Sequence, residues 1–182
     1  LTVFFDLSPW FFLFFIPALS MNTFSEEIDR GTFQLLRSLP ITTTQILMAK
    51  YGALAVIVLC TLFPSVIFIQ TIALLGFPTF NYDSSLIIGG YVALLLLNLC
   101  FIAIGLLASS LSNKQPVAFI LGLVLNFIFW QGSLELGLSP FDLSTHYHRM
   151  SMGVLSFSDL LYLGGFLSLF LGLTRVRLRF LT

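Results

Sequence analysis

Ionisable side chains interrupt this chain only at intervals, and the stretches between them are long and apolar. No Asp, Glu, Lys or Arg occurs in five stretches: 7–25, 51–82, 84–113, 115–134 and 160–174. A helix needs about 20 residues, at about 1.5 Å each, to cross a ~30 Å hydrocarbon core. The pattern therefore predicts five membrane-spanning helices, near residues 9–24, 46–73, 86–109, 117–136 and 157–174.

The second of these stretches is longer than one straight span requires. It contains Pro64, which we expect to kink the helix, and then Gly76 and Pro78, which we expect to end it in a short loop. The chain thus predicts one long bent helix here and not two shorter ones.

Composition excludes a soluble domain. Of 182 residues, 58% are hydrophobic and 9% charged, whereas soluble domains carry roughly 25% charged residues. A soluble core of this size could not enclose so much apolar surface, so most of the chain must face the lipid bilayer. The net charge of zero gives no indication of nucleic-acid binding. We predict an all-α, polytopic transmembrane helix bundle that forms one domain over residues 1–182.

Basic residues fall unevenly on the two sides that five crossings define. One side receives seven of the 8: Arg30, Arg37, Lys50, Lys114, Arg175, Arg177 and Arg179. The other side receives Arg149 alone, together with Asp6, Asp83, Glu135, Asp142 and Asp159. Cytoplasmic loops carry the excess of Lys and Arg, so we expect a cytoplasmic C-terminus in a bacterial plasma (inner) membrane. Leu1 would then lie outside, which predicts one further helix upstream and six in all.

The segment 25–40, between the first two predicted spans, has an amphipathic pattern. Phe33, Leu36 and Leu39 recur at three-residue steps, and the residues between them are largely polar or charged. Thr23 and Glu26 have the spacing of a capping box, while Pro40 stops the segment. This pattern predicts a short helix along the membrane surface. It fits a plain interfacial linker and a docking helix for a cytoplasmic partner equally well.

The string EEIDRGTFQLLRSLPIT, which starts at Glu26, resembles the signature of type-2 ABC exporter permeases. The resemblance rests on an acidic start, a Gly-Thr pair, a leucine-rich stretch and then Leu-Pro-Ile-Thr. It implies a coupling helix that sits in a groove of a separate ATP-binding subunit, with the contact made by Glu26, Glu27, Arg30, Gly31, Thr32, Phe33, Leu36, Arg37, Leu39 and Pro40. It also implies a second permease copy, or a related chain, as partner.

Two later segments extend this resemblance over nearly the whole chain. LLASSLSNKQPVAFILGL, turning at Asn113, Lys114 and Gln115, is similar to the family's loop between its fourth and fifth helices. HYHRMSMGVLSFSDLLYL resembles the gliding-motility branch of the family at Ser151, Gly153, Val154, Asp159, Leu160, Leu161 and Tyr162. It departs from that branch at Met152, where a basic residue is common.

A phosphate-binding P-loop needs a lysine followed by Ser or Thr. Lys50 is followed by Tyr51 and Lys114 by Gln115, so neither lysine fits that motif. We therefore expect no catalytic, cofactor or metal site in this chain, and expect ATP and Mg²⁺ to be bound by the partner subunit.

Two competing functions remain open. In an extended segment, His146 and His148 would point the same way and could bind one metal ion, as in an intramembrane metal-dependent enzyme. Interfacial residues at the headgroup level are the simpler interpretation of both histidines. A membrane scaffold of a motility or secretion apparatus, without transport, is the second alternative.

Small and polar residues inside the spans predict helix contacts. Gly164, Ser168 and Gly172 recur every four residues, as do Ala118 and Gly122, and such stripes allow close helix approach within one bundle or between two copies. We expect Asn98, Asn126 and Gln131 to form hydrogen bonds across helices or to line a path. Cys60 and Cys100 are interpreted as free thiols.

Overall fold

The computed structural model describes residues 2–33, 40–75, 84–132, 142–154 and 156–180. Every regular element in this part of the chain is helical. The elements are α1 (Thr2–Ser20), α2 (Asn22–Asp29), α4 (Thr43–Leu75), α5 (Ser84–Leu111), α6 (Gln115–Phe127), the π-helix η1 (Ile128–Gly132), α8 (Leu143–Ser151) and α9 (Phe157–Phe180). Five helical segments of the described residues are long and apolar enough to cross a membrane. The predicted all-α polytopic bundle is confirmed.

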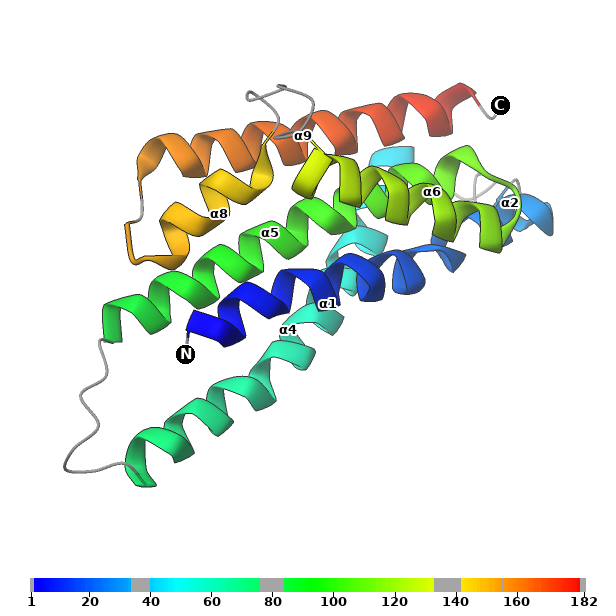
Figure 1. Cartoon of the computed structure of the whole chain (residues 1–182). Helices are drawn as coiled ribbons and strands as arrows, with labels where there is room; N and C mark the ends of the chain where they lie inside the picture. Colours follow the sequence, from blue (N-terminus) through cyan, green and yellow to red (C-terminus); the bar gives the residue numbers. More distant parts are fainter. Residues whose placement is uncertain (1, 34–39, 76–83, 133–141, 155, 181–182) are drawn as a thin grey trace.

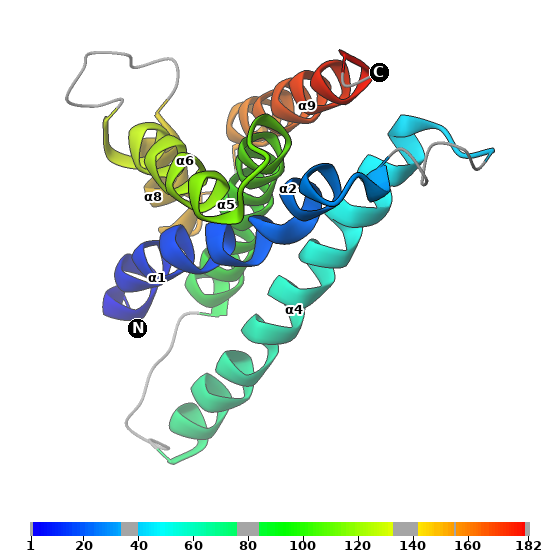
Figure 2. The same cartoon turned by 90° about the vertical axis from the view of Figure 1, so that its right-hand side faces the viewer.

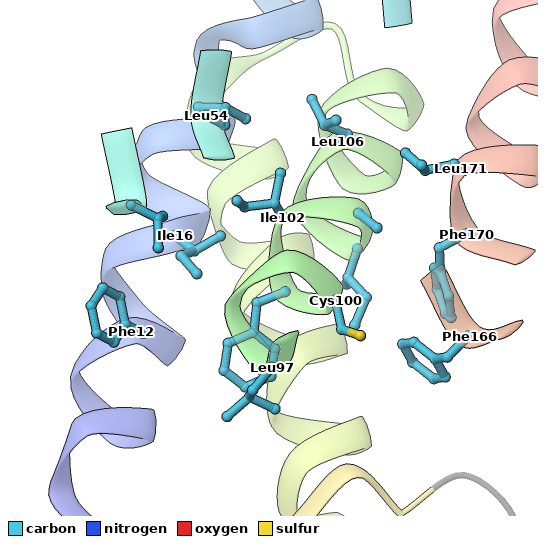
Figure 3. Packing of buried hydrophobic residues seen from close by; sticks show 14 of the residues in the cluster. Phe12, Ile16, Leu54, Leu97, Cys100, Ile102, Leu106, Phe166, Phe170 and Leu171 are labelled. Carbon is cyan, nitrogen blue, oxygen red and sulfur yellow. The ribbon is translucent and has the colours of Figure 1, made fainter. Parts of the chain in front are cut away.

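Helix α5 forms the centre of the bundle, with α1, α6, α8 and α9 around it (Figure 1). Its most apolar window is 72% buried inside the protein, against 17% for α4. Figure 3 shows α5 side chains, among them Leu97, Ile102 and Leu106, between residues of α1 on one side and of α9 on the other. Helix α4 diverges from this core along most of its length (Figure 2), and most of its apolar surface is exposed.

The observed helices differ from the predicted ones mainly at their ends. Helix α4 runs without interruption through Pro64 for 33 residues, or about 50 Å, and ends at Leu75; Gly76 and Pro78 lie outside the described residues. Helix α9 continues to Phe180, six residues beyond the predicted end at 174, because three arginines extend it past the apolar stretch. Helix α6 gives way at Ile128 to a π-helix that ends at Gly132.

The turn between α5 and α6 lies at the predicted residues. The Ser112 hydroxyl accepts a hydrogen bond from the Lys114 amide at 3.1 Å and donates one to the Lys114 carbonyl at 3.0 Å. Pro116 then stands in the first turn of α6, where its missing amide hydrogen costs nothing. This side-chain bridge replaces the helical hydrogen bonds that end at Leu111.

The bundle has two distinct ends, which the predicted topology also separates. We call the α2 end the one that carries α2, the turn at 112–114 and the C-terminal turns of α9 (Figure 1). The opposite end carries α8 and the first turns of α1, α5 and α9, and we call it the α8 end.

Candidate functional site

The predicted coupling segment begins with α2, which follows α1 after a single residue. Met21 keeps helical backbone angles and donates its amide to the Pro17 carbonyl at 2.9 Å. Thr23 therefore lies inside α2, and no side chain of α2 caps its first residue. The predicted capping box of Thr23 and Glu26 is wrong, because the helical backbone continues from α1 through Met21.

A residue far along the chain takes over the capping. The Ser109 hydroxyl, on α5, accepts hydrogen bonds from the amides of Phe24 at 3.0 Å and Ser25 at 3.2 Å. The same hydroxyl donates to the Met21 carbonyl at 3.0 Å. The first amides of a helix have no partner inside it, so one buried serine satisfies two of them and fixes α2 to α5.

A second contact fixes α2 to α4. The Lys50 ammonium lies 2.5 Å from a carboxylate oxygen of Glu27 and 4.4 Å from the centre of the Phe24 ring. It also donates a hydrogen bond to the Thr23 carbonyl. Both charged side chains are mostly buried, with 18% of Lys50 and 25% of Glu27 exposed. Helix α2 is thus clamped between two membrane-crossing helices, and we call Ser109 and Lys50 the α2 clamp.

The predicted continuous helix over 25–40 is interrupted. Helix α2 ends at Asp29, and Gly31 follows with φ of +69° before Thr32 and Phe33 turn helical again. The amides of Arg30 and Gly31 bond back to α2 carbonyls at 3.0 and 3.2 Å. Glycine ends helices in this conformation because it lacks a Cβ. The amphipathic spacing of the sequence did not account for this break.

The predicted contact residues divide into three groups. Glu26, Arg30, Gly31, Thr32 and Pro40 lie at the surface or partly exposed, and Arg30 pairs with Glu26 at 2.7 Å. Phe33 and Glu27 face the protein: Phe33 is 4% exposed and its ring meets that of Phe24 edge-on, while Glu27 pairs with Lys50 of α4. Both therefore support the segment from within the protein. Leu36, Arg37 and Leu39 lie outside the described residues.

A surface pocket adjoins α2 and was not anticipated from the sequence. It has a volume of about 330 Å³ and is lined by Glu26, Asp29, Arg30, Lys114, Gln115 and Pro116. Two carboxylates and two cations thus surround one depression at the α2 end, and we call it the charged pocket. The predicted topology already set the segment 25–40 and Lys114 on the same side, but only the fold brings them together.

The two histidines do not converge. Both lie on α8, where residues two apart point about 200° away from each other. His146 bonds to Asp159 and stacks on Tyr162, while the His148 ring nitrogen lies 3.9 Å from Asp6. Among the described residues no group of three or more His, Cys, Asp or Glu could hold a metal ion. The extended geometry expected for a shared metal ion is therefore wrong.

The predicted helix-packing residues have different surroundings. A Cβ on Gly122 would contact Pro17 at 3.4 Å and Ala108 at 3.5 Å, so this glycine lets α6 approach α1 and α5. Gly164, Ser168 and Gly172 are instead exposed on α9, and no neighbouring atom lies near either glycine's Cβ position. This stripe makes no contact within the described part of the bundle.

Within the described part of the chain, the side chains of two buried asparagines do not form the hydrogen bonds that were expected. Asn98 and Asn126 are both fully buried, and in the described residues neither side chain has a hydrogen-bond partner. The predicted hydrogen bonds across helices are absent for both.

One family model matches this chain. The model described as "ABC-2 family transporter protein" covers residues 7–179, which includes all five candidate spans almost completely. Neither a curated protein nor a solved structure matches the chain. The match is to the family as a whole, so the narrower resemblance to the gliding-motility branch stays a prediction.

Proposed function

Because this chain belongs to the ABC-2 family of transporter proteins, we propose that it couples ATP hydrolysis by a separate ATP-binding subunit to the export of a substrate. Membership of this family, together with the five candidate spans, makes the chain a multi-pass membrane component of a transporter. The coupling, its residues and its orientation are the proposal.

The α2 clamp is the observation that carries the proposal. A surface segment that only linked two spans would need no fixed attachment to either. Here Ser109 fixes the start of α2 to α5, and Lys50 fixes it to α4. A force applied to α2 would therefore reach the central helix and the helix that diverges from it. Contiguous packed and hydrogen-bonded elements are what carries such coupling.

The charged pocket supplies a surface for the partner. Its exposed side chains, Arg30 and Asp29 among them, give charges of both signs at the α2 end. We assign this end to the cytoplasm, since Lys50 pairs with α2, Lys114 lines the pocket beside it, and Arg177 and Arg179 lie in the last turn of α9. The ATP-binding subunit binds ATP and Mg²⁺, and its closure pushes α2. The equilibrium between inward-open and outward-open states then shifts by the difference in ATP affinity between them.

The proposal includes a second permease copy or a related permease chain, in a bacterial plasma membrane. A role in gliding motility follows from the resemblance around Ser151 and Asp159 and belongs to the same proposal. The scaffold alternative differs in a measurable way, because it predicts stable partners without ATP-dependent movement of a solute.

Affinity purification from native membranes in mild detergent tests the coupling. Tagged full-length protein should retain an ATP-hydrolysing subunit, and Arg30→Glu should lose it because the substitution reverses one charge of the pocket. The matched control is Arg175→Glu, an exposed cation at the same end outside the pocket. Leu36→Asp serves as a second test variant.

The outcomes separate the candidate functions. Retention by the wild type and Arg175→Glu, with loss in Arg30→Glu, supports the permease role and locates its docking surface. Equal retention in all variants would remove the pocket from the interface. Protein that binds no ATPase at all, under conditions that keep other membrane complexes intact, would favour the scaffold.

A further inference from the structure

Helix α8 lies at the end of the bundle opposite the proposed docking surface and is too short to cross a membrane. It has nine residues, and its N-cap is Asp142, whose carboxylate accepts hydrogen bonds from the Ser144 amide at 3.0 Å and from the Thr145 hydroxyl. Its apolar side, with Leu143, Tyr147 and Met150, is buried. His146 is half-buried beside that side, while His148 and Arg149 are exposed.

Two of its attachments are made by buried groups that carry no charge. The Tyr147 hydroxyl donates a 2.6 Å hydrogen bond to the Phe5 carbonyl of α1. Burial, and to a smaller extent the charge of Asp6, raises the pKa of Tyr147 above its ordinary value, so it stays a neutral donor. At α5, a Cβ on Gly89 would lie 2.9 Å from the Gly153 Cα and 3.0 Å from the Met150 carbonyl oxygen. Backbone therefore packs directly on backbone there.

The attachment to α9 is ionic. Asp159 lies in the first turn of α9 with its side chain fully buried. One of its oxygens, Oδ1, lies 2.6 Å from His146 Nδ1 and 2.9 Å from an Arg149 guanidinium nitrogen. The His146 ring also stacks on Tyr162 of α9, with centroids 4.0 Å apart and planes 15° from parallel. We call Asp159, His146 and Arg149 the α8–α9 latch.

Three groups of the latch meet at one point. The Arg149 guanidinium, which can only donate, donates to Oδ1 and also lies 3.0 Å from His146 Nδ1. Whether Nδ1 donates to the carboxylate or accepts from the guanidinium depends on the tautomer of His146. The other carboxylate oxygen, Oδ2, is buried without a hydrogen-bond partner in the described residues.

We infer that Asp159 is a positioning residue whose bonds to Arg149 and His146 form a releasable latch between α8 and α9. This inference rests on the proposed transport function, in which that end of the bundle must open. Release of the latch would lower the free energy of Oδ2, because a buried acceptor without a partner gains hydrogen bonds when water reaches it. Arg149 is 53% exposed, so water already reaches the other side of the pair.

The geometry also indicates which contacts stay. Tyr147 and the Gly89–Gly153 contact hold α8 on α1 and α5 through buried neutral groups. Opening at the latch would release α8 from the start of α9, while α9 keeps its packing against α5. Among the described residues, the other charged groups near α8 are Asp6 on α1, whose carboxylate lies 3.9 Å from the partly exposed His148, and Asp142 at the N-cap of α8.

Hydrogen exchange measured by mass spectrometry on the full chain in lipid nanodiscs tests the latch. Asp159→Asn and Arg149→Gln should each speed amide exchange in α8 and in the first turns of α9 by about tenfold, the effect of losing a charge-assisted bond that closes a local opening. Arg149→Lys keeps the cation and should restore most of the protection. The matched control is Asp6→Asn, which breaks only the exposed contact with His148 and should leave exchange unchanged.

Two results would overturn the inference. One is unchanged exchange in both Asp159→Asn and Arg149→Gln; the other is an equal acceleration in Asp6→Asn. Should Asp159→Asn fail to assemble, Arg149→Gln decides alone, since it alters a half-exposed side chain. The measurement needs no ATP-binding subunit, so failure of the latch and failure of the proposed function give different results.

Discussion

Each end of the bundle holds one short helix, and the two are held by different chemistry. Helix α2 is fixed by a neutral hydroxyl, Ser109, and by an ion pair whose members are 18% and 25% exposed. Helix α8 is fixed to α9 by a carboxylate with 0% exposure. A hydroxyl bonded on both sides makes a contact that has no reason to open, whereas a buried carboxylate with one unbonded oxygen gains on opening. We therefore expect α2 to transmit force as a rigid attachment and α8 to act as the contact that yields.

The largest expected effect comes from closing the space between α5 and α8. Gly89→Val places side-chain carbons where the Gly153 backbone lies 2.9 Å from the Cβ position, and backbone cannot move aside as a flexible side chain can. We expect a loss of about 3 kcal/mol or more, the upper range for overpacked sites. Thermal denaturation in detergent, followed by size-exclusion chromatography, measures it.

The control for that change is another glycine in a helix that crosses the membrane. Gly164→Val, on α9, adds the same carbons where no atom beyond the neighbouring residues and backbone of its own helix lies within 4 Å of the Cβ position. Its melting temperature should stay within a degree or two of the wild type, since surface substitutions are usually worth no more than about 0.5 kcal/mol. Equal destabilisation by both variants would mean that α8 does not rest on Gly89.

A smaller effect should follow from opening the α2 clamp. Ser109→Ala removes the acceptor for the Phe24 and Ser25 amides and leaves both buried, at a cost of about 1–3 kcal/mol. The amides of α2 should lose protection in hydrogen exchange, while those of α8 keep theirs. Ser110→Ala is the matched control, because that hydroxyl bonds only to the Leu107 carbonyl of its own helix at 2.7 Å. Protection of α2 that survives Ser109→Ala would contradict the clamp.

These contacts also explain what could be predicted from the sequence. The spans followed from the spacing of ionisable residues, because bilayer thickness dictates how long an apolar helix must be. The turn at Asn113 and Lys114 followed in the same way. Capping of α2 could not, since its partner Ser109 stands 85 residues from Phe24 and no local pattern marks it.

The histidines illustrate the same limit. Residue types suggested a shared ion for His146 and His148, whereas the helical backbone of α8 turned one toward Asp159 and the other toward Asp6. The repeat of the backbone decides where side chains point. Residues two apart point to the same face of a strand but to different sides of a helix. The family resemblance includes Gly31 only as part of a Gly-Thr pair, and its position at the end of α2 is visible only in the structure.

The smallest expected effect distinguishes the two parts of the α2 clamp. Lys50→Met keeps an apolar stem over Phe24 but removes the charge that lies 2.5 Å from Glu27. Because both side chains are partly exposed, we expect a loss of about 1 kcal/mol, below the value for a fully buried pair. Thermal denaturation against Lys114→Met, an exposed lysine of the charged pocket, measures the difference. A loss of stability as large as that of Ser109→Ala would make the ion pair the main attachment of α2. Added salt should then lower the stability of that attachment, because salt screens an ion pair and leaves a neutral hydrogen bond unaffected.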